Sequence, residues 1–121
     1  MNEIELNGSV YVLKSSVNTH KKAEDLNGMP YVLVRTYSAG VHAGYLKSRN
    51  GKEVELLQAR RIWYWEGAAS LSQLAEEGTK KPDNCKFPCE VSRIELTEAI
   101  EILQVTKQAQ ESIKNVKIWE M

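Results

Sequence analysis

The dipeptide Asn50-Gly51 constrains the fold of this chain more than any other local feature. It lies between residues 42–49 and residues 52–58, and Asn-Gly readily supplies the positive φ angles of both central positions of a type I′ turn. The sequence therefore predicts an antiparallel hairpin with Asn50 and Gly51 at its turn.

Further strands are predicted where β-branched and aromatic residues gather, at residues 9–13, 31–37, 60–65 and 90–96. Residues 18–27 are polar and charged, which suits a loop or a short helix. In the Trp-rich strand at 60–65, alternation places Arg61, Trp63 and Trp65 on one face. Its other face then carries Arg60, Ile62 and Tyr64.

Two helices are expected. Ser70 and Gln73 match a capping box, which predicts a short helix that ends near Glu77 with Gly78 as its stop. Residues 99–105 read as a strand followed by a helix from Thr106, although a helical stripe also fits this region. The expected fold is a single α+β domain, residues 1–121, with a mostly antiparallel sheet, a short helix after the Trp-rich strand and a C-terminal helix.

The charge balance argues against two classes of partner. The 16 Lys and Arg residues equal the 16 Asp and Glu residues, so no overall positive field would hold duplex nucleic acid or an anionic membrane. No segment approaches the roughly 20 apolar residues of a membrane span, and the first residues do not resemble a signal peptide. We therefore expect a cytosolic protein with reduced cysteines.

No set of side chains typical of an active site or a metal centre is apparent. Cys85 and Cys89 would need two more zinc ligands, and the only histidines, His20 and His42, lie far away in sequence. His42 could act as a general base, but no nucleophile or orienting group accompanies it. We predict no catalytic residue, no metal site and no cofactor.

Arginines and aromatic residues in apolar segments suggest a binding site for a nucleotide. Arg35, Arg60 and Arg61 lie among apolar residues, where a guanidinium needs a carboxylate partner or an anion such as a phosphate. Residues 63–65, Trp-Tyr-Trp, could stack on adenine, although tryptophan in a strand is more often part of the core. A carboxylate or an anion as partner of each arginine, and stacking or core packing of residues 63–65, all stay open.

Loops could complete such a site. Small residues before the capped helix, around Ala68 and Ser70, would let a phosphate approach backbone N–H groups, although every helix has such a start. Residues 38–40, Ser-Ala-Gly, form a second small-residue turn.

The proline-bounded loop at 82–88 offers an amide, a cation and an aromatic ring, and we expect its phenylalanine to be the main stacking residue. Thr36 and Tyr37, which follow Arg35 in the strand at 31–37, are added to these candidates. The predicted ligand-binding set is Arg35, Thr36, Tyr37, Arg60, Arg61, Trp63, Ala68, Ser70, Asn84, Lys86 and Phe87.

Three stretches of the chain resemble a known family. They are residues 31–44 (YVLVRTYSAGVHAG), residues 59–75 (ARRIWYWEGAASLSQLA) and residues 81–87 (KPDNCKF). These stretches resemble the first-described Thoeris anti-defence family of bacteriophage proteins, in particular members from clostridia or their phages.

The resemblance implies a sponge that is not an enzyme. Such a protein would capture a cyclic ADP-ribose isomer (gcADPR), made from NAD by a bacterial TIR-domain enzyme, in the cytoplasm of the bacterial host and would not cleave it. The resemblance also implies a homo-oligomer, either a dimer or a dimer-based hexamer. For some members it implies cyclic oligonucleotides as a second class of ligand.

Two other functions remain open. One is an enzyme that degrades the same signal, for which His42 near Arg35 would be the starting point. The other is a protein-interaction module that inhibits a host defence protein, with residues 63–65 as its aromatic anchor.

Overall fold

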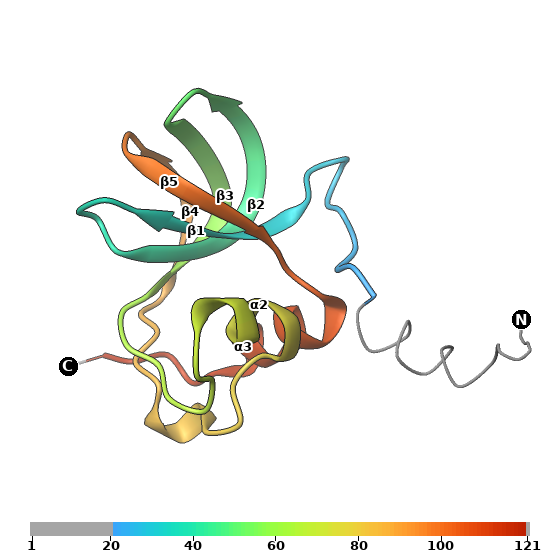
Figure 1. Cartoon of the computed structure of the whole chain (residues 1–121), viewed down its shortest axis with the longest axis vertical. Coiled ribbons are helices and arrows are strands. Elements are labelled where there is room, and N and C mark those ends of the chain that lie inside the picture. Colours follow the sequence, from blue (N-terminus) through green and yellow to red (C-terminus); the bar gives the residue numbers. More distant parts are fainter. Residues whose placement is uncertain (1–20, 121) are drawn as a thin grey trace, which may run out of the picture.

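Five strands and two α-helices make up residues 21–120, the part of the chain that the computed structural model describes (Figure 1). The strands are β1 (Tyr31–Thr36), β2 (Val41–Asn50), β3 (Glu53–Ile62), β4 (Glu90–Leu96) and β5 (Ala99–Gln104). The helices are α2 (Leu71–Glu77) and α3 (Lys107–Asn115), and a 3-10 turn spans Pro82–Asn84.

The predicted α+β class is confirmed, because all strand pairs are antiparallel and both predicted helices are present. The strand predicted at residues 9–13 lies outside the described residues. Residues 21–27 contain no helix. No helix of the described region is long and apolar enough to cross a membrane.

The sheet is strongly curled. Its strand order is β4-β3-β2-β1-β5, so β4 and β5 form opposite edges, yet only Thr97 and Glu98 separate them in sequence. Backbone bonds fix this link, since Ala99 N donates to Lys52 O at 3.0 Å and Tyr37 N donates to Glu98 O at 3.0 Å. The two edges therefore approach each other at this end, and the bending of β2 and β3 is visible in Figure 1.

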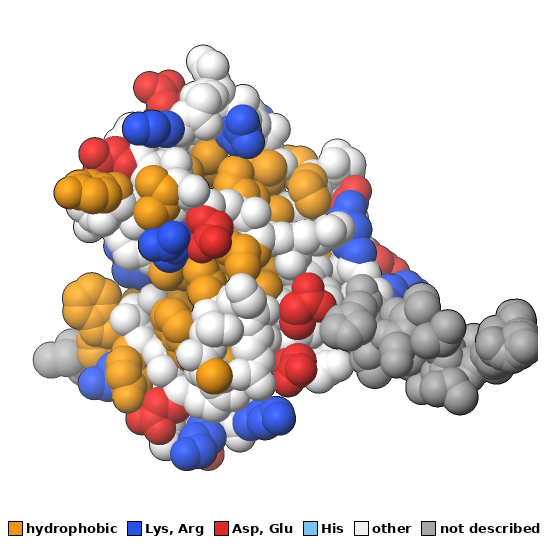
Figure 2. All heavy atoms as spheres, in the orientation of Figure 1, with side chains coloured by type: hydrophobic (Ala, Val, Ile, Leu, Met, Phe, Trp, Pro, Cys, Tyr) orange, Lys and Arg blue, Asp and Glu red, His pale blue; other side chains and the backbone are white. Residues whose placement is uncertain are grey.

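The curl produces two apolar cores. One contains only residues of the sheet, such as Val34 and Leu56, and lies inside the curl. The other lies between the sheet and the helices and includes Leu33, Leu74 and Ile113. Figure 2 shows apolar side chains gathered between the sheet and the helices on the face in view. Because β1 contributes to both cores, it is buried on both of its faces.

The predicted hairpin is present, but its turn is one residue further along the chain than expected. Asn50 pairs with Glu53, so the two central residues are Gly51 and Lys52. Gly51 has a φ of 62°, whereas Asn50 remains in β2. The prediction of Asn50 as a central residue is therefore wrong, because strand pairing continues through it.

The strand predicted at residues 60–65 is the end of β3 and not a separate element. Alternation holds as far as Trp63, since Arg60 and Ile62 are buried while Trp63 is 62% exposed. Beyond Ile62 the regular strand ends, and Tyr64 is exposed instead of facing the core.

The two predicted helix starts are confirmed by their caps. The Ser70 hydroxyl accepts a hydrogen bond from Gln73 N at 3.1 Å, and Gly78 follows α2 with a φ of 77°. The Thr106 hydroxyl accepts from Ala109 N at 3.0 Å, so the tail is a strand followed by a helix.

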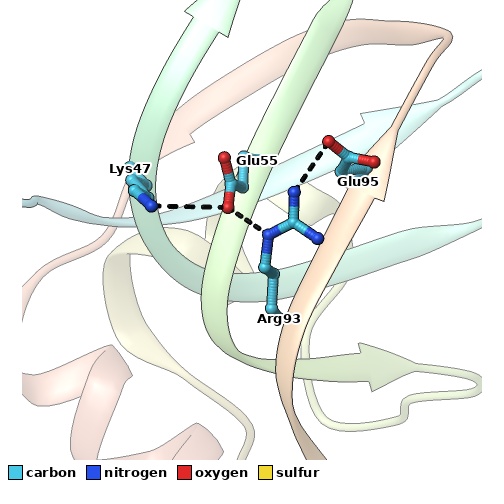
Figure 3. Close-up of polar contacts among 4 residues, drawn as sticks. All are labelled: Lys47, Glu55, Arg93 and Glu95. Carbon is cyan, nitrogen blue, oxygen red and sulfur yellow. Dashed lines mark hydrogen bonds and ion pairs between the residues drawn. The ribbon is translucent and has the colours of Figure 1, made fainter.

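Charged residues line the solvent face of neighbouring strands (Figure 3). Glu55 on β3 pairs with Arg93 on β4 and, at 3.7 Å, with Lys47 on β2. Arg93 also contacts Glu95 at 2.9 Å. Glu55 is opposite Glu95 in the register, so its pair with Arg93 is a diagonal contact between neighbouring strands. Ion pairs at the protein surface add little stability of their own.

A buried arginine joins the sheet to the segments that follow it. Arg60 on β3 is 6% exposed, and its guanidinium donates three hydrogen bonds to backbone carbonyls. Nε donates to Pro88 O at 2.9 Å, Nη1 to Ile113 O at 2.8 Å and Nη2 to Phe87 O at 3.0 Å. Three carbonyl oxygens from two segments thus take the place of the carboxylate or anion considered for Arg60.

We expect Arg60→Met to destabilise the protein by about 3 kcal/mol or more, because it removes three hydrogen bonds donated by one charged group. Arg61→Met is the matched control, since Arg61 makes one exposed hydrogen bond and its loss should cost about 1 kcal/mol or less. Equilibrium unfolding in urea measures both. Equal stability of the two variants would show that the Arg60 bonds do not hold these segments together.

Candidate functional site

A hollow of about 260 Å³ lies where the β1–β2 turn meets the end of β3. Its lining residues are Ser38, Ala39, Gly40, Arg61, Ile62 and Trp63. Pairing of β2 with β3 brings these segments together, since Val41 is opposite Ile62 and His42 is opposite Arg61. The sheet register therefore creates the hollow.

The turn that forms one wall of the hollow is held by its own hydrogen bonds. The Thr36 hydroxyl accepts from Ala39 N at 2.8 Å and donates to Gly40 O at 2.7 Å. The Ala39 carbonyl accepts from Arg61 Nη1 at 2.8 Å and from His42 Nε2 at 3.0 Å. Arg61 is thereby fixed beside the turn, with its other N–H groups unpartnered among residues 21–120.

Trp63 supplies an exposed aromatic wall. Its backbone N–H donates to Lys86 O at 3.2 Å, and its ring lies parallel to that of Trp119, with centroids 6.4 Å apart and planes 6° apart. Lys86 Nζ lies 5.7 Å from the centroids of both the Tyr64 and the Trp119 rings. We name Trp63, Tyr64, Lys86 and Trp119 the aromatic cluster.

Three of the predicted ligand-binding residues meet at the hollow. Arg61 and Trp63 line it, and Thr36 holds its turn. Lys86 belongs to the adjoining aromatic cluster. Tyr37 follows β1 and is 78% exposed, but it does not line the hollow.

The other predicted residues have separate structural contacts. Arg35 pairs with Glu101 at 2.8 Å, which is the carboxylate alternative considered for it. Asn84 Nδ2 donates to Glu66 Oε1 at 3.0 Å. At the start of α2, Ser70 is the N-cap and Ala68 O accepts from Trp65 Nε1 at 3.2 Å.

Phe87 differs most from expectation. It is fully buried, pairs through its backbone with Ile118 and lies beneath the guanidinium of Arg60, 5.4 Å from ring centroid to Cζ. Its ring belongs to the core between the sheet and the helices, so it offers no stacking face in this structure. The ring of Phe87 was expected to be exposed because it lies in a loop, but the C-terminal segment covers this loop.

Sequence reasoning missed Trp119 in the aromatic cluster. Its backbone N–H donates to Phe87 O at 3.0 Å, which places the C-terminal segment beside the loop before β4. The signal in the sequence is an aromatic residue in the short segment of apolar and charged residues, 116–121, that follows the last predicted helix.

The described residues contain no group of three His, Cys, Asp or Glu that could hold a metal ion. Cys85 and Cys89 are free thiols, the first buried and the second exposed. His42 is 1% exposed, and burial lowers the pKa of its imidazole below the usual value. The neutral ring donates to Ala39 O and helps to hold the turn.

The lowered pKa of His42 predicts a loss of stability in mild acid. As the pH falls below about 6.5, the unfolded chain takes up a proton that the folded protein resists, so the free energy of unfolding decreases. His42→Gln, which keeps a donor for Ala39 O, should lack this decrease. Urea unfolding at several pH values measures it. The same decline in the variant would contradict the assignment, because His20 is present in both proteins.

No curated protein and no solved structure matches this chain significantly. One family matches, described as a domain of unknown function (DUF6948), and the match covers residues 29–113. This range includes the hollow and most of the fold, but not Trp119. The chain therefore belongs to the DUF6948 family.

Proposed function

We propose that this protein is a non-enzymatic sponge that binds gcADPR or a related cyclic ADP-ribose isomer at the hollow and withholds it from its receptor. The observation that carries the proposal is that Arg61 and Trp63 line one hollow. The resemblance to the Thoeris anti-defence family supplies the identity of the ligand. The proposed place of action is the cytoplasm of a bacterial host.

The chemistry of the hollow suits a nucleotide. The exposed face of Trp63 can stack on adenine, which contributes about 1 to 3 kcal/mol per base. The free N–H groups of Arg61 can donate to diphosphate oxygens. The small residues Ala39 and Gly40 let the ligand approach the backbone of the turn.

The size of the hollow supports a shared site. A sponge needs a dissociation constant of about nanomolar, or roughly −12 kcal/mol, which requires a ligand covered on several sides. An open hollow of about 260 Å³ falls below the usual size of pockets that enclose such ligands. We therefore propose a homo-oligomer, a dimer or a dimer-based hexamer, in which a second copy covers the ligand. Cyclic oligonucleotides are the second proposed ligand class.

A protein-interaction inhibitor is the second candidate function. Tyr37, Trp63 and Tyr64 are 78%, 62% and 45% exposed, and exposed aromatic residues often act as anchors in protein interfaces. This function predicts tight binding to a host defence protein without any nucleotide.

Isothermal titration with cyclic ADP-ribose isomers tests the sponge. We expect nanomolar binding, weakened about 5- to 150-fold by Trp63→Ala through loss of stacking. Arg61→Gln should weaken binding about tenfold or more through loss of charged hydrogen bonds. Arg49→Gln is the matched control, since Arg49 lies at the far end of β2 and does not line the hollow.

Heat release and chromatography of the bound nucleotide then separate the alternatives. Recovery of intact ligand supports sequestration, whereas a hydrolysed product would favour the degrading enzyme. If no isomer binds, the sponge proposal fails and the interaction inhibitor takes its place.

A further inference from the structure

A second cavity, of about 310 Å³, lies between the start of β1, the last residues of β3, the start of β4 and the C-terminal end of α3. Its lining residues are Tyr31, Arg60, Glu90, Lys114, Val116 and Ile118. None of them lines the hollow at Trp63, so the two sites are distinct.

Lys114 brings one positive charge to this cavity. Its Nζ lies 5.4 Å from the centroid of the Tyr31 ring and 5.0 Å from that of Tyr45, and it donates to the Tyr45 hydroxyl at 3.0 Å. Lys114 has no carboxylate partner among residues 21–120. The two rings hold the ammonium group in place while leaving its charge without a counterion.

Arg60 brings the second positive charge. Its three hydrogen bonds go to the neutral carbonyl oxygens of Phe87, Pro88 and Ile113. No carboxylate of residues 21–120 forms an ion pair with this guanidinium, although Glu90 is close enough to interact with it electrostatically. Glu90 is the one carboxylate that lines the cavity, and it forms no ion pair within the described region. The lining therefore carries one more positive than negative charge.

Tyr31 adds a buried donor. The residue is 2% exposed, and its hydroxyl has no hydrogen-bond partner among residues 21–120. The hydroxyl is close enough to Glu90 and Arg60 to interact with both electrostatically. Burial, together with Tyr45 and Glu90, raises the pKa of the Tyr31 hydroxyl above its ordinary range, so it remains protonated. A buried hydroxyl without a partner is costly unless a ligand accepts a hydrogen bond from it.

We propose that this cavity binds a phosphate group, separately from the hollow at Trp63. The phosphate oxygens would accept hydrogen bonds from the Tyr31 hydroxyl, from Lys114 Nζ and from the N–H groups of Arg60 that the carbonyls leave free. Either free phosphate or the phosphate of a larger ligand presents this chemistry. The proposal does not depend on the sponge function, because it uses none of the residues of the hollow.

NMR of the uniformly ¹⁵N-labelled full chain tests this site. Inorganic phosphate is titrated near neutral pH at constant ionic strength, and the Nε–Hε signal of Arg60 reports on the cavity. We expect a saturable shift that chloride does not reproduce. Lys114→Met, which keeps the apolar part of the side chain, should weaken phosphate binding about tenfold or more. Lys107→Met is the matched control on the same helix and should bind as the unaltered protein does.

Tyr31→Phe removes only the unpartnered hydroxyl, so the folded protein should persist while phosphate binding weakens severalfold. No saturable shift, or a shift that Lys114→Met and Tyr31→Phe both leave unchanged, overturns the proposal. Trp63→Ala should leave phosphate binding intact, so failure of the sponge proposal would be distinguishable from failure of this one.

AMP serves as the second probe. Tighter binding of AMP than of phosphate, followed by the Arg60 signal in the Trp63→Ala variant, indicates a phosphorylated ligand, and equal affinities indicate the free ion.

Discussion

The three hydrogen bonds of Arg60 connect the parts of this protein that the sheet alone cannot hold. They join β3 to the segment before β4 through Phe87 and Pro88, and to the end of α3 through Ile113. A planar guanidinium suits this task because its N–H groups point in fixed directions toward several acceptors. With Phe87 held in place, its carbonyl also accepts from Trp119 N, so the aromatic cluster depends on the same contact.

The strand register and the alternation of side chains along β3 explain where the two candidate sites lie. The β1–β2 turn reaches the end of β3, which places the turn at 38–40 beside Arg61 and Trp63. On the other side of β3, Arg60 faces α3, and its charge meets that of Lys114 in the second cavity. Because side chains alternate along a strand, the neighbouring residues Arg60 and Arg61 serve different sites.

The sequence singled out two residues that line the hollow, but not the burial of Phe87. Arg61 and Trp63 were predicted because an arginine and an aromatic residue in an apolar strand suit a nucleotide, and both line the hollow. Phe87 was predicted to stack because loop residues are usually exposed, but the C-terminal segment buries it. Tertiary contacts of this kind join residues far apart in the chain, and local patterns carry no signal for them.

The sequence by itself determined the α+β class, the β2–β3 hairpin, the extent of β4 and the caps of both helices. These features depend on contacts between residues close in the chain, such as the bond from Gln73 N to the Ser70 hydroxyl. Only the tertiary structure decided that β5 pairs with β1, that Arg60 binds carbonyls while Arg35 binds Glu101, and that Lys114 lies over two tyrosine rings. The physical reason is that a charged or aromatic side chain has several acceptable partners, and the packing of distant segments selects among them.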